Sequence, residues 1–171
     1  MRASVASGAH GSLARVNLVD ELHAVAAALV QAGIKHAVCG GVAVTVYGAT
    51  RSTKDIDILI APDDLARAMD VVRPLGYAFP AFPLVFDEGT DKERRVQRVS
   101  KLEDGEHLVL DFLLEECSLK GFLDGRIQVT LPEGPLMVVS RDVLIRMKRQ
   151  AGRPQDVADL EQLERPQGDS T

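Results

Sequence analysis

The sequence predicts an α/β fold in which helices pack against a small mixed β-sheet, with two helices at the C-terminal end. Segments with an apolar stripe at helical spacing alternate with short runs of β-branched residues, separated by glycine, proline or capping residues. The chain has 171 residues, of which 46% are hydrophobic and 26% charged, as expected for a globular domain with a buried core. We therefore predict one domain over 16–165, with a C-terminal helical part at about 140–165 and flexible tails at 1–15 and 166–171.

The first part of the chain alternates helix and strand. Asn17 can cap a helix that Gly33 ends, and a short strand follows at 35–39. The segment 42–47 is ambiguous, because its β-branched residues favour a strand. A turn from a strand through two glycines into a helix would, however, aim backbone N–H groups at an anion. We expect a helix there, followed by a strand at 54–61.

The rest of the chain predicts a helix, several strands and two more helices. Pro62 and the two acids behind it suit the start of a helix that runs to about 73. Asp104-Gly105 is typical of a hairpin turn. The strands are expected at roughly 94–102, 106–115 and 126–131. Ser140 can cap a helix that Gly152 ends, and a last helix is expected from 153 to about 165.

Composition limits the classes of function. The net charge of −5 argues against a broad nucleic-acid-binding surface. Two cysteines are too few for a disulfide framework, and the four histidines are scattered, which argues against a zinc site. No apolar stretch approaches the length of a membrane span, and the first dozen residues do not resemble a signal peptide. We therefore expect a cytoplasmic protein that does not enter a membrane.

Asp55 and Asp57 are the most informative pair in the sequence. Residues two apart on a strand point the same way, so both carboxylates emerge on one face while Ile56, Ile58 and Ile60 face a core. Two negative charges that close repel each other. A divalent cation removes the conflict, because Mg²⁺ prefers carboxylate oxygens and keeps positions open for phosphate.

Gly40 and Gly41 precede this pair and supply a backbone without side chains, which can approach a phosphate closely. Asp111 lies in an otherwise apolar run, 108–114, that is typical of a central strand. A carboxylate there is costly unless it binds a metal or pairs with an Arg or Lys of the preceding strand. Taken alone, Asp111 favours the ion pair. Beside the other two aspartates we favour metal binding, since three carboxylates from neighbouring strands can hold two Mg²⁺ ions.

Further side chains are candidates for nucleotide binding. Arg51 and Thr53 lie within reach of a triphosphate, although Arg51 can equally be a solvated loop residue. Lys148 lies beside the apolar stripe of its helix and either extends outward or points into a cleft at a phosphate. Asp156 falls on the buried stripe of the last helix and ranks above Asp159, although it can simply be a charge that caps the helix start.

A basic cluster precedes Asp111 in the sequence. It could line an acceptor groove, but a run of charges is more often a solvated face. Its members are Lys92, Arg94, Arg95, Arg98 and Lys101.

The segment 39–59, followed by Asp111, resembles the signature of the nucleotidyltransferase superfamily, which has a DNA polymerase beta-like fold. The nearest likeness is to AbiEii-type toxins and to small antibiotic nucleotidyltransferases of the lincosamide kind, and 144–160 is similar to the end of many such proteins. The resemblance implies that Gly40 and Gly41 contact nucleotide phosphates. It also implies that Asp55 and Asp57 bind two Mg²⁺ (or Mn²⁺) ions together with Asp111, a candidate general base.

This resemblance implies transfer of a nucleoside monophosphate from an NTP such as ATP to a hydroxyl acceptor, with release of pyrophosphate. The acceptor can be a tRNA, a protein or an antibiotic. We lean toward a toxin-like or defence-system protein, which would have a cognate antitoxin. Two alternatives stay open: a non-catalytic nucleotide- or partner-binding module on the same scaffold, and a two-metal phosphodiesterase.

Overall fold

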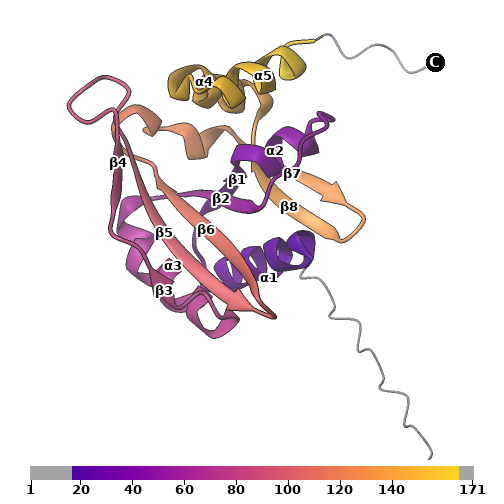
Figure 1. Ribbon diagram of the computed structural model, residues 1–171, viewed down its shortest axis with the longest axis vertical. Coiled ribbons are helices and arrows are strands. Elements are labelled where there is room, and N and C mark those ends of the chain that lie inside the picture. The colour runs from indigo at the N-terminus through magenta and orange to yellow at the C-terminus, as the bar shows by residue number, and fades with distance from the viewer. Residues whose placement is uncertain (1–16, 166–171) are drawn as a thin grey trace, which may run out of the picture.

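The computed structural model describes residues 17–165 (Figure 1). The tails predicted at 1–15 and 166–171 lie outside the described residues, and a single domain over 16–165 stays a prediction. The helices are α1 (Leu18–Gln31), α2 (Gly40–Val46), α3 (Leu65–Val72), α4 (Arg141–Ala151) and α5 (Pro154–Leu163). The strands are β1 (His36–Cys39), β2 (Asp55–Ile60), β3 (Phe79–Pro80), β4 (Leu84–Phe86), β5 (Arg94–Glu103), β6 (Glu106–Leu114), β7 (Arg126–Leu131) and β8 (Gly134–Val139).

The strands form one mixed sheet, which confirms the predicted α/β class. Their order is β3-β5-β6-β2-β1-β8-β7, with β4 also paired to β5. The central pair β2 and β6 is parallel, whereas β1 and β5, which flank it, run antiparallel to their neighbours in that pair. In Figure 1, α4 and α5 lie together at one end of the molecule, and α1 and α3 lie at the other.

Capping residues set the helix ends where the sequence predicts them. The Asn17 side chain accepts a hydrogen bond from the Val19 N–H at 3.0 Å, so it satisfies a donor that has no partner within the helix. Ser140 does the same for the Val143 N–H at 3.3 Å. Gly152 ends α4 in the left-handed conformation, with a φ of 60°. The ambiguous segment 42–47 falls within α2 up to Val46, as expected.

Three strands were not predicted, and proline explains why. β8 begins with Gly134-Pro135, and β3 and β4 lie around two further prolines, where a strand is normally disfavoured. β3 and β4 are short strands beside the outer edge of β5, a place where proline removes no ladder bond from a central strand. The predicted helix at 62–73 also differs, since it opens as a 3₁₀ turn before α3.

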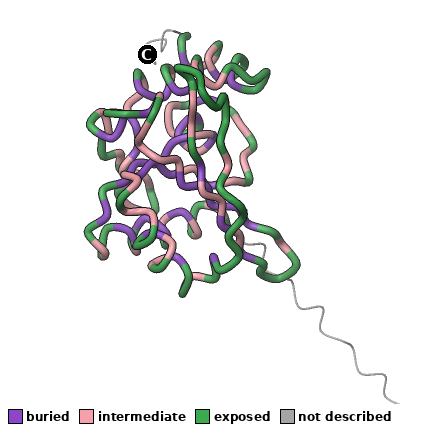
Figure 2. Tube along the Cα trace, turned by 90° about the vertical axis from the view of Figure 1, so that its left-hand side faces the viewer, coloured by how far each residue is buried: buried purple, intermediate pink, exposed green. Residues whose placement is uncertain are grey.

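The core lies on both sides of the central strands, where Figure 2 shows buried residues inside a shell of exposed ones. Ile56, Ile58 and Ile60 are all 0% exposed, as their alternation with the two aspartates predicts. On the neighbouring strand, Leu110 and Phe112 are equally buried on either side of Asp111. The aspartates therefore stand on a sheet whose opposite face is fixed by close packing.

No helix within 17–165 is both long enough and apolar enough to cross a membrane.

A pair of leucine substitutions tests this packing. Leu110 is 0% exposed and Leu102 is 66% exposed, although both lie on the β5–β6 hairpin. Leu110→Ala should lower the free energy of unfolding by about 2–5 kcal/mol, because it leaves a cavity. Leu102→Ala should change it by less than about 0.5 kcal/mol. Urea denaturation measures both, and equal effects would contradict the described core.

Candidate active site

Strand register brings Asp57 and Asp111 directly opposite each other. β2 and β6 are parallel neighbours, and Asp57 pairs with Asp111 in their register. Residues paired in this way present their side chains on the same face of the sheet. On the other side of β2, Asp57 pairs with Cys39, the last residue before the glycines.

Every residue predicted for the site lines one cavity of about 160 Å³, which we call the aspartate cavity. Its lining includes the three aspartates, the two glycines and side chains from α4 and α5. The predicted residues found there are Gly40, Gly41, Arg51, Thr53, Asp55, Asp57, Asp111, Lys148 and Asp156. Segments far apart in the sequence therefore meet at one place.

Asp57 is buried without a direct ion-pair partner. Within 17–165, no hydrogen bond or ion pair reaches the carboxylate of Asp57 or that of Asp55 at the distances that define such contacts. Burial raises the pKa of Asp57 to about 6, the negative charges of Asp111 and Asp55 add to the shift, and the positive charges of Lys148 and Arg153 offset part of it. A cation bound next to this buried carboxylate would stabilise its ionised form.

The glycines are required by the packing of the site. Gly40 has a φ of +61°, and a Cβ placed on it would lie 1.9 Å from Asp57 Oδ2. A Cβ on Gly41 would lie 2.8 Å from the hydroxyl oxygen of Thr53. Both distances are shorter than a van der Waals contact. Only glycine, which has no side chain, therefore lets the turn pack this closely against Asp57 and Thr53.

Asp111 is held by an arginine. Arg98 donates from Nε to Asp111 Oδ1 and from Nη2 to Oδ2, both at 2.8 Å. The two residues lie opposite each other in the antiparallel register of β5 and β6. The sequence left open an ion pair with the preceding strand, and the structure has that pair. Within 17–165, no group of three or more His, Cys, Asp or Glu side chains is arranged to hold a metal ion.

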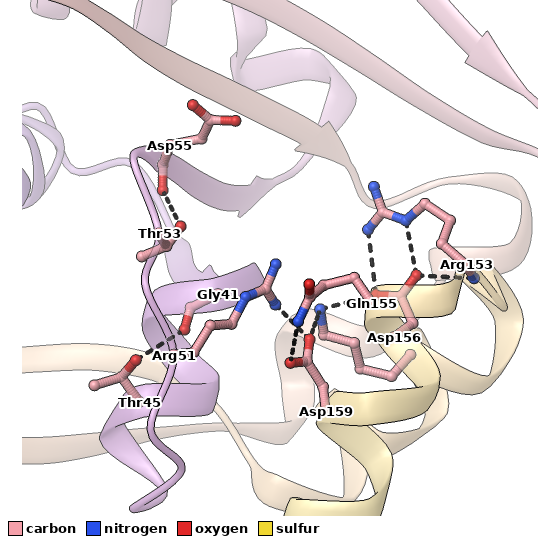
Figure 3. A network of polar contacts seen from close by, with 10 residues as sticks. Gly41, Thr45, Arg51, Thr53, Asp55, Arg153, Gln155, Asp156 and Asp159 are labelled. Atoms are coloured by element: carbon pink, nitrogen blue, oxygen red, sulfur yellow. Dashed lines mark hydrogen bonds and ion pairs between the residues drawn. The ribbon is translucent and has the colours of Figure 1, made fainter.

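Lys148 is buried in a network of ion pairs with Asp156 and Asp159, the two acids that Figure 3 shows on α5. It is only 4% exposed, and its ammonium lies 2.9 Å from Asp156 Oδ1 and 2.8 Å from Asp159 Oδ2. The extended, solvated alternative for Lys148 is therefore wrong. Arg51 pairs with Asp159 as well, and Figure 3 shows it reaching from the segment before β2 toward α5.

Asp156 lies both at the cavity and at the start of α5. It lines the aspartate cavity, and it also accepts a hydrogen bond from the backbone N–H of Arg153 at the start of α5, at 3.2 Å. Burial alone would raise the pKa of Asp156, but hydrogen bonds from Arg153 and Lys148 outweigh it and hold the pKa below its usual value.

Sequence reasoning underrated Asp159. The buried residues of α5 are Asp156, Asp159 and Leu163, which have the spacing i, i+3 and i+7 of one helical face. Asp159 is 0% exposed and contacts both Lys148 and Arg51. Its spacing from Asp156 was a sufficient signal. It does not line the aspartate cavity itself, so its role there is to hold cations in place.

The basic cluster does not form one groove. Side chains alternate along β5, so Arg94 and Arg98 face the aspartate cavity and Arg95 faces away from it. Lys101 is 8% exposed and pairs with Glu21 and Glu103.

Thr53 lies in the cavity lining, where its hydroxyl donates to the backbone carbonyl of Asp55 at 3.3 Å.

The donor set fits a divalent cation in part. Asp55 and Asp57 offer hard carboxylate oxygens, and both residues line the aspartate cavity. Asp111 can join them only through oxygens that Arg98 already contacts, so Arg98 and the cation compete for the same negative charge.

No protein-family model matches this sequence, and no curated protein matches it in sequence. Solved structures do match the fold. TM1012 from Thermotoga maritima, a proposed nucleotidyltransferase, superposes with a TM-score of 0.59 at 14% identity, over 84% of this chain and 89% of that one. LnuA, a lincosamide antibiotic adenylyltransferase with lincomycin bound, gives 0.58 at 15% identity, over 84% and 94%.

A third match is ANT(2″)-Ia in complex with adenylyl-2″-tobramycin. It has a TM-score of 0.55 at 17% identity, over 85% of this chain and 86% of that one. At these identities the matches establish the fold alone. The chain has the fold of nucleotidyltransferases, antibiotic adenylyltransferases among them.

The charge on Asp57 predicts a pH-dependent loss of stability in metal-free protein. Because its pKa is raised to about 6, the folded state binds a proton more tightly than the unfolded state. The stability that Asp57 contributes is fully present below about pH 4 and is lost as the pH rises through about 6. As the pH rises from 4 to 7, the free energy of unfolding of Asp57→Asn should therefore increase by about 1–3 kcal/mol relative to that of the wild type. Urea denaturation in EDTA measures the difference, and a difference that does not change with pH would contradict it.

Two glycines with similar φ separate backbone strain from collision. Gly33 has a φ of +68° with nothing within 4 Å of an added Cβ, whereas a Cβ on Gly40 would strike Asp57. Gly33→Ala should cost about 1–2 kcal/mol of stability from backbone strain alone. Gly40→Ala should cost clearly more, measured by the same denaturation. Equal costs would show that Asp57 does not pack against the turn.

Proposed function

We propose that this protein is a divalent-metal-dependent nucleotidyltransferase that moves a nucleoside monophosphate from an NTP to a hydroxyl acceptor and releases pyrophosphate. One observation carries the proposal. Asp55, Asp57 and Asp111 meet a turn of two glycines at a single cavity, in a chain with a nucleotidyltransferase fold. The pKa of Asp57 is raised despite the nearby positive charges of Lys148 and Arg153, so a further cation at this cavity would stabilise the ionised carboxylate.

The residues divide the work by their chemistry. We assign phosphate contacts to the backbone of Gly40 and Gly41, which lines the cavity and adds no side chain of its own to it. Asp55 and Asp57 would hold the cation, with Asp111 as the third carboxylate. When bound, a divalent cation neutralises charge on the triphosphate and acidifies the acceptor hydroxyl.

Cations of the chain face the same cavity. Arg51, Lys148 and Arg153 all line it, and each is already paired with an acid on α5. These pairs keep the positive charges at the wall where a polyphosphate would lie. We assign Arg51, Thr53, Lys148 and Asp156 to this nucleotide wall.

A small molecule is the acceptor class that the comparisons support. LnuA is an antibiotic adenylyltransferase solved with lincomycin, and ANT(2″)-Ia is solved with an adenylylated tobramycin. This chain spans 94% and 86% of those two chains, so it has room for a site of similar extent. The tRNA and protein acceptors, the toxin-like role, an antitoxin partner and the likeness to AbiEii-type proteins stay predictions from the sequence resemblance.

A second function has one observation in its favour. Asp111, Lys148 and Asp156 already satisfy one another's charges or those of nearby residues, as in a scaffold that needs no turnover. A module that binds nucleotide without transferring it would keep such pairs. Calorimetry separates the two functions, because the module would bind NTP with Mg²⁺ and leave the nucleotide intact.

Nucleotide transfer can be measured directly. The protein is incubated with each α-labelled NTP, Mg²⁺ and a panel of aminoglycosides, lincosamides, tRNA and cell extract. Label should enter one acceptor class, and Asp57→Asn should lower the rate at least about 100-fold, because it removes a charged ligand. Asp63→Asn, the same chemical change at an exposed position just after β2, should retain the rate.

Three results would contradict the proposal. Full transfer by Asp57→Asn would place the chemistry elsewhere. NTP binding with no transfer to any acceptor would favour the binding module. Cleavage of a phosphodiester without an NTP would favour the phosphodiesterase.

A further inference from the structure

Arg98 forms a bidentate ion pair with Asp111. The two N–H···O contacts are 2.8 Å each and use both carboxylate oxygens, a geometry that only a guanidinium supplies. The Asp111 side chain is 10% exposed, and the Arg98 side chain is 39% exposed. The carboxylate is therefore fixed at the cavity, while the cation that holds it can withdraw to water.

The position of Arg98 compensates a charge that would otherwise repel Asp57. Asp57 and Asp111 face each other on adjacent strands, and two ionised carboxylates so placed destabilise the sheet. Asp111 raises the pKa of Arg98 through their hydrogen bonds, and the charges of Asp55 and Asp57 act in the same direction. Arg98 is thus the one cation within 17–165 that forms an ion pair with any of the three aspartates.

We propose that Arg98 is a built-in counter-ion that competes with a divalent cation for Asp111 and thereby sets the metal affinity of the aspartate cavity. The inference rests on the proposed function, since it concerns the same site. A cation that ligated Asp111 would weaken or replace two charge-assisted hydrogen bonds and would lie close to the positive charge of Arg98. Removal of Arg98 should therefore strengthen metal binding, although it removes a side chain from the site.

Arg94 provides a matched control. It lies four residues earlier on β5, lines the same cavity and carries the same charge. It pairs with Asp87 at 2.7 Å and not with any of the three aspartates. Arg94→Gln consequently removes the long-range repulsion of one positive charge, whereas Arg98→Gln removes that repulsion together with the bond to Asp111.

The test is a titration of metal-free protein with Mn²⁺ alone, in which free Mn²⁺ is followed by electron paramagnetic resonance. Arg98→Gln should bind Mn²⁺ at least about tenfold more tightly than the wild type, because two charge-assisted hydrogen bonds no longer oppose it. Arg94→Gln should change the affinity by less than about threefold, since it removes only a screened charge. Asp57→Asn should bind Mn²⁺ much more weakly, which assigns the signal to this cavity.

Failure of the inference differs from failure of the proposed function. If the wild type binds Mn²⁺ through Asp57 but Arg98→Gln binds no more tightly than Arg94→Gln, the inference alone is wrong. If the wild type binds no Mn²⁺, or binds it equally after Asp57→Asn, the inference and the proposed metal site are both wrong. Should Arg98→Gln not fold, Arg98→Lys replaces it. Its ammonium cannot bridge both oxygens, so a smaller gain in Mn²⁺ affinity is expected and no gain overturns the inference.

Discussion

The parallel pairing of β2 with β6 is the constraint on which the rest of the site depends. That register sets Asp57 opposite Asp111, so two carboxylates share one face of a sheet whose other face is closely packed. Neither strand can shift by one residue without turning its isoleucines or leucines to the wrong side. The glycine at position 40 follows from the same constraint, because any side chain there would occupy the space of the Asp57 carboxylate.

The surrounding charges are arranged unevenly. Asp111 has Arg98, and the two buried acids of α5 have Lys148 and two further arginines. Such buried pairs add little net stability, but each fixes the position of the groups it joins. Asp57 is left without a partner among the described residues. Among the acids that line the cavity, only Asp55 and Asp57 have no ion-pair partner within 17–165. A further cation would therefore favour the place beside these two carboxylates, next to the glycine turn.

Much of this could be read from the sequence, because the decisive features are local. Alternation placed Ile56 and Ile58 in the core and the two aspartates opposite them, and capping residues marked the ends of α1 and α4. What depends on tertiary register could not be read. The ion-pair partner of Asp111 depends on which residue of β5 lies opposite it in the sheet. β8 was not predicted, because its second residue is a proline. Asp159 is a different case, since its spacing of three residues from Asp156 is visible in the sequence and places both acids on one helical face.

The central claim is that Asp55 and Asp57 form the cation site of this cavity. Crystals grown with Mn²⁺ and measured at its absorption edge test it most directly, because anomalous scattering locates the ion without assumptions about its ligands. The account predicts the strongest anomalous peak between the carboxylates of Asp55 and Asp57. A protein with Mn²⁺ bound elsewhere, and no peak at these two residues, would contradict it.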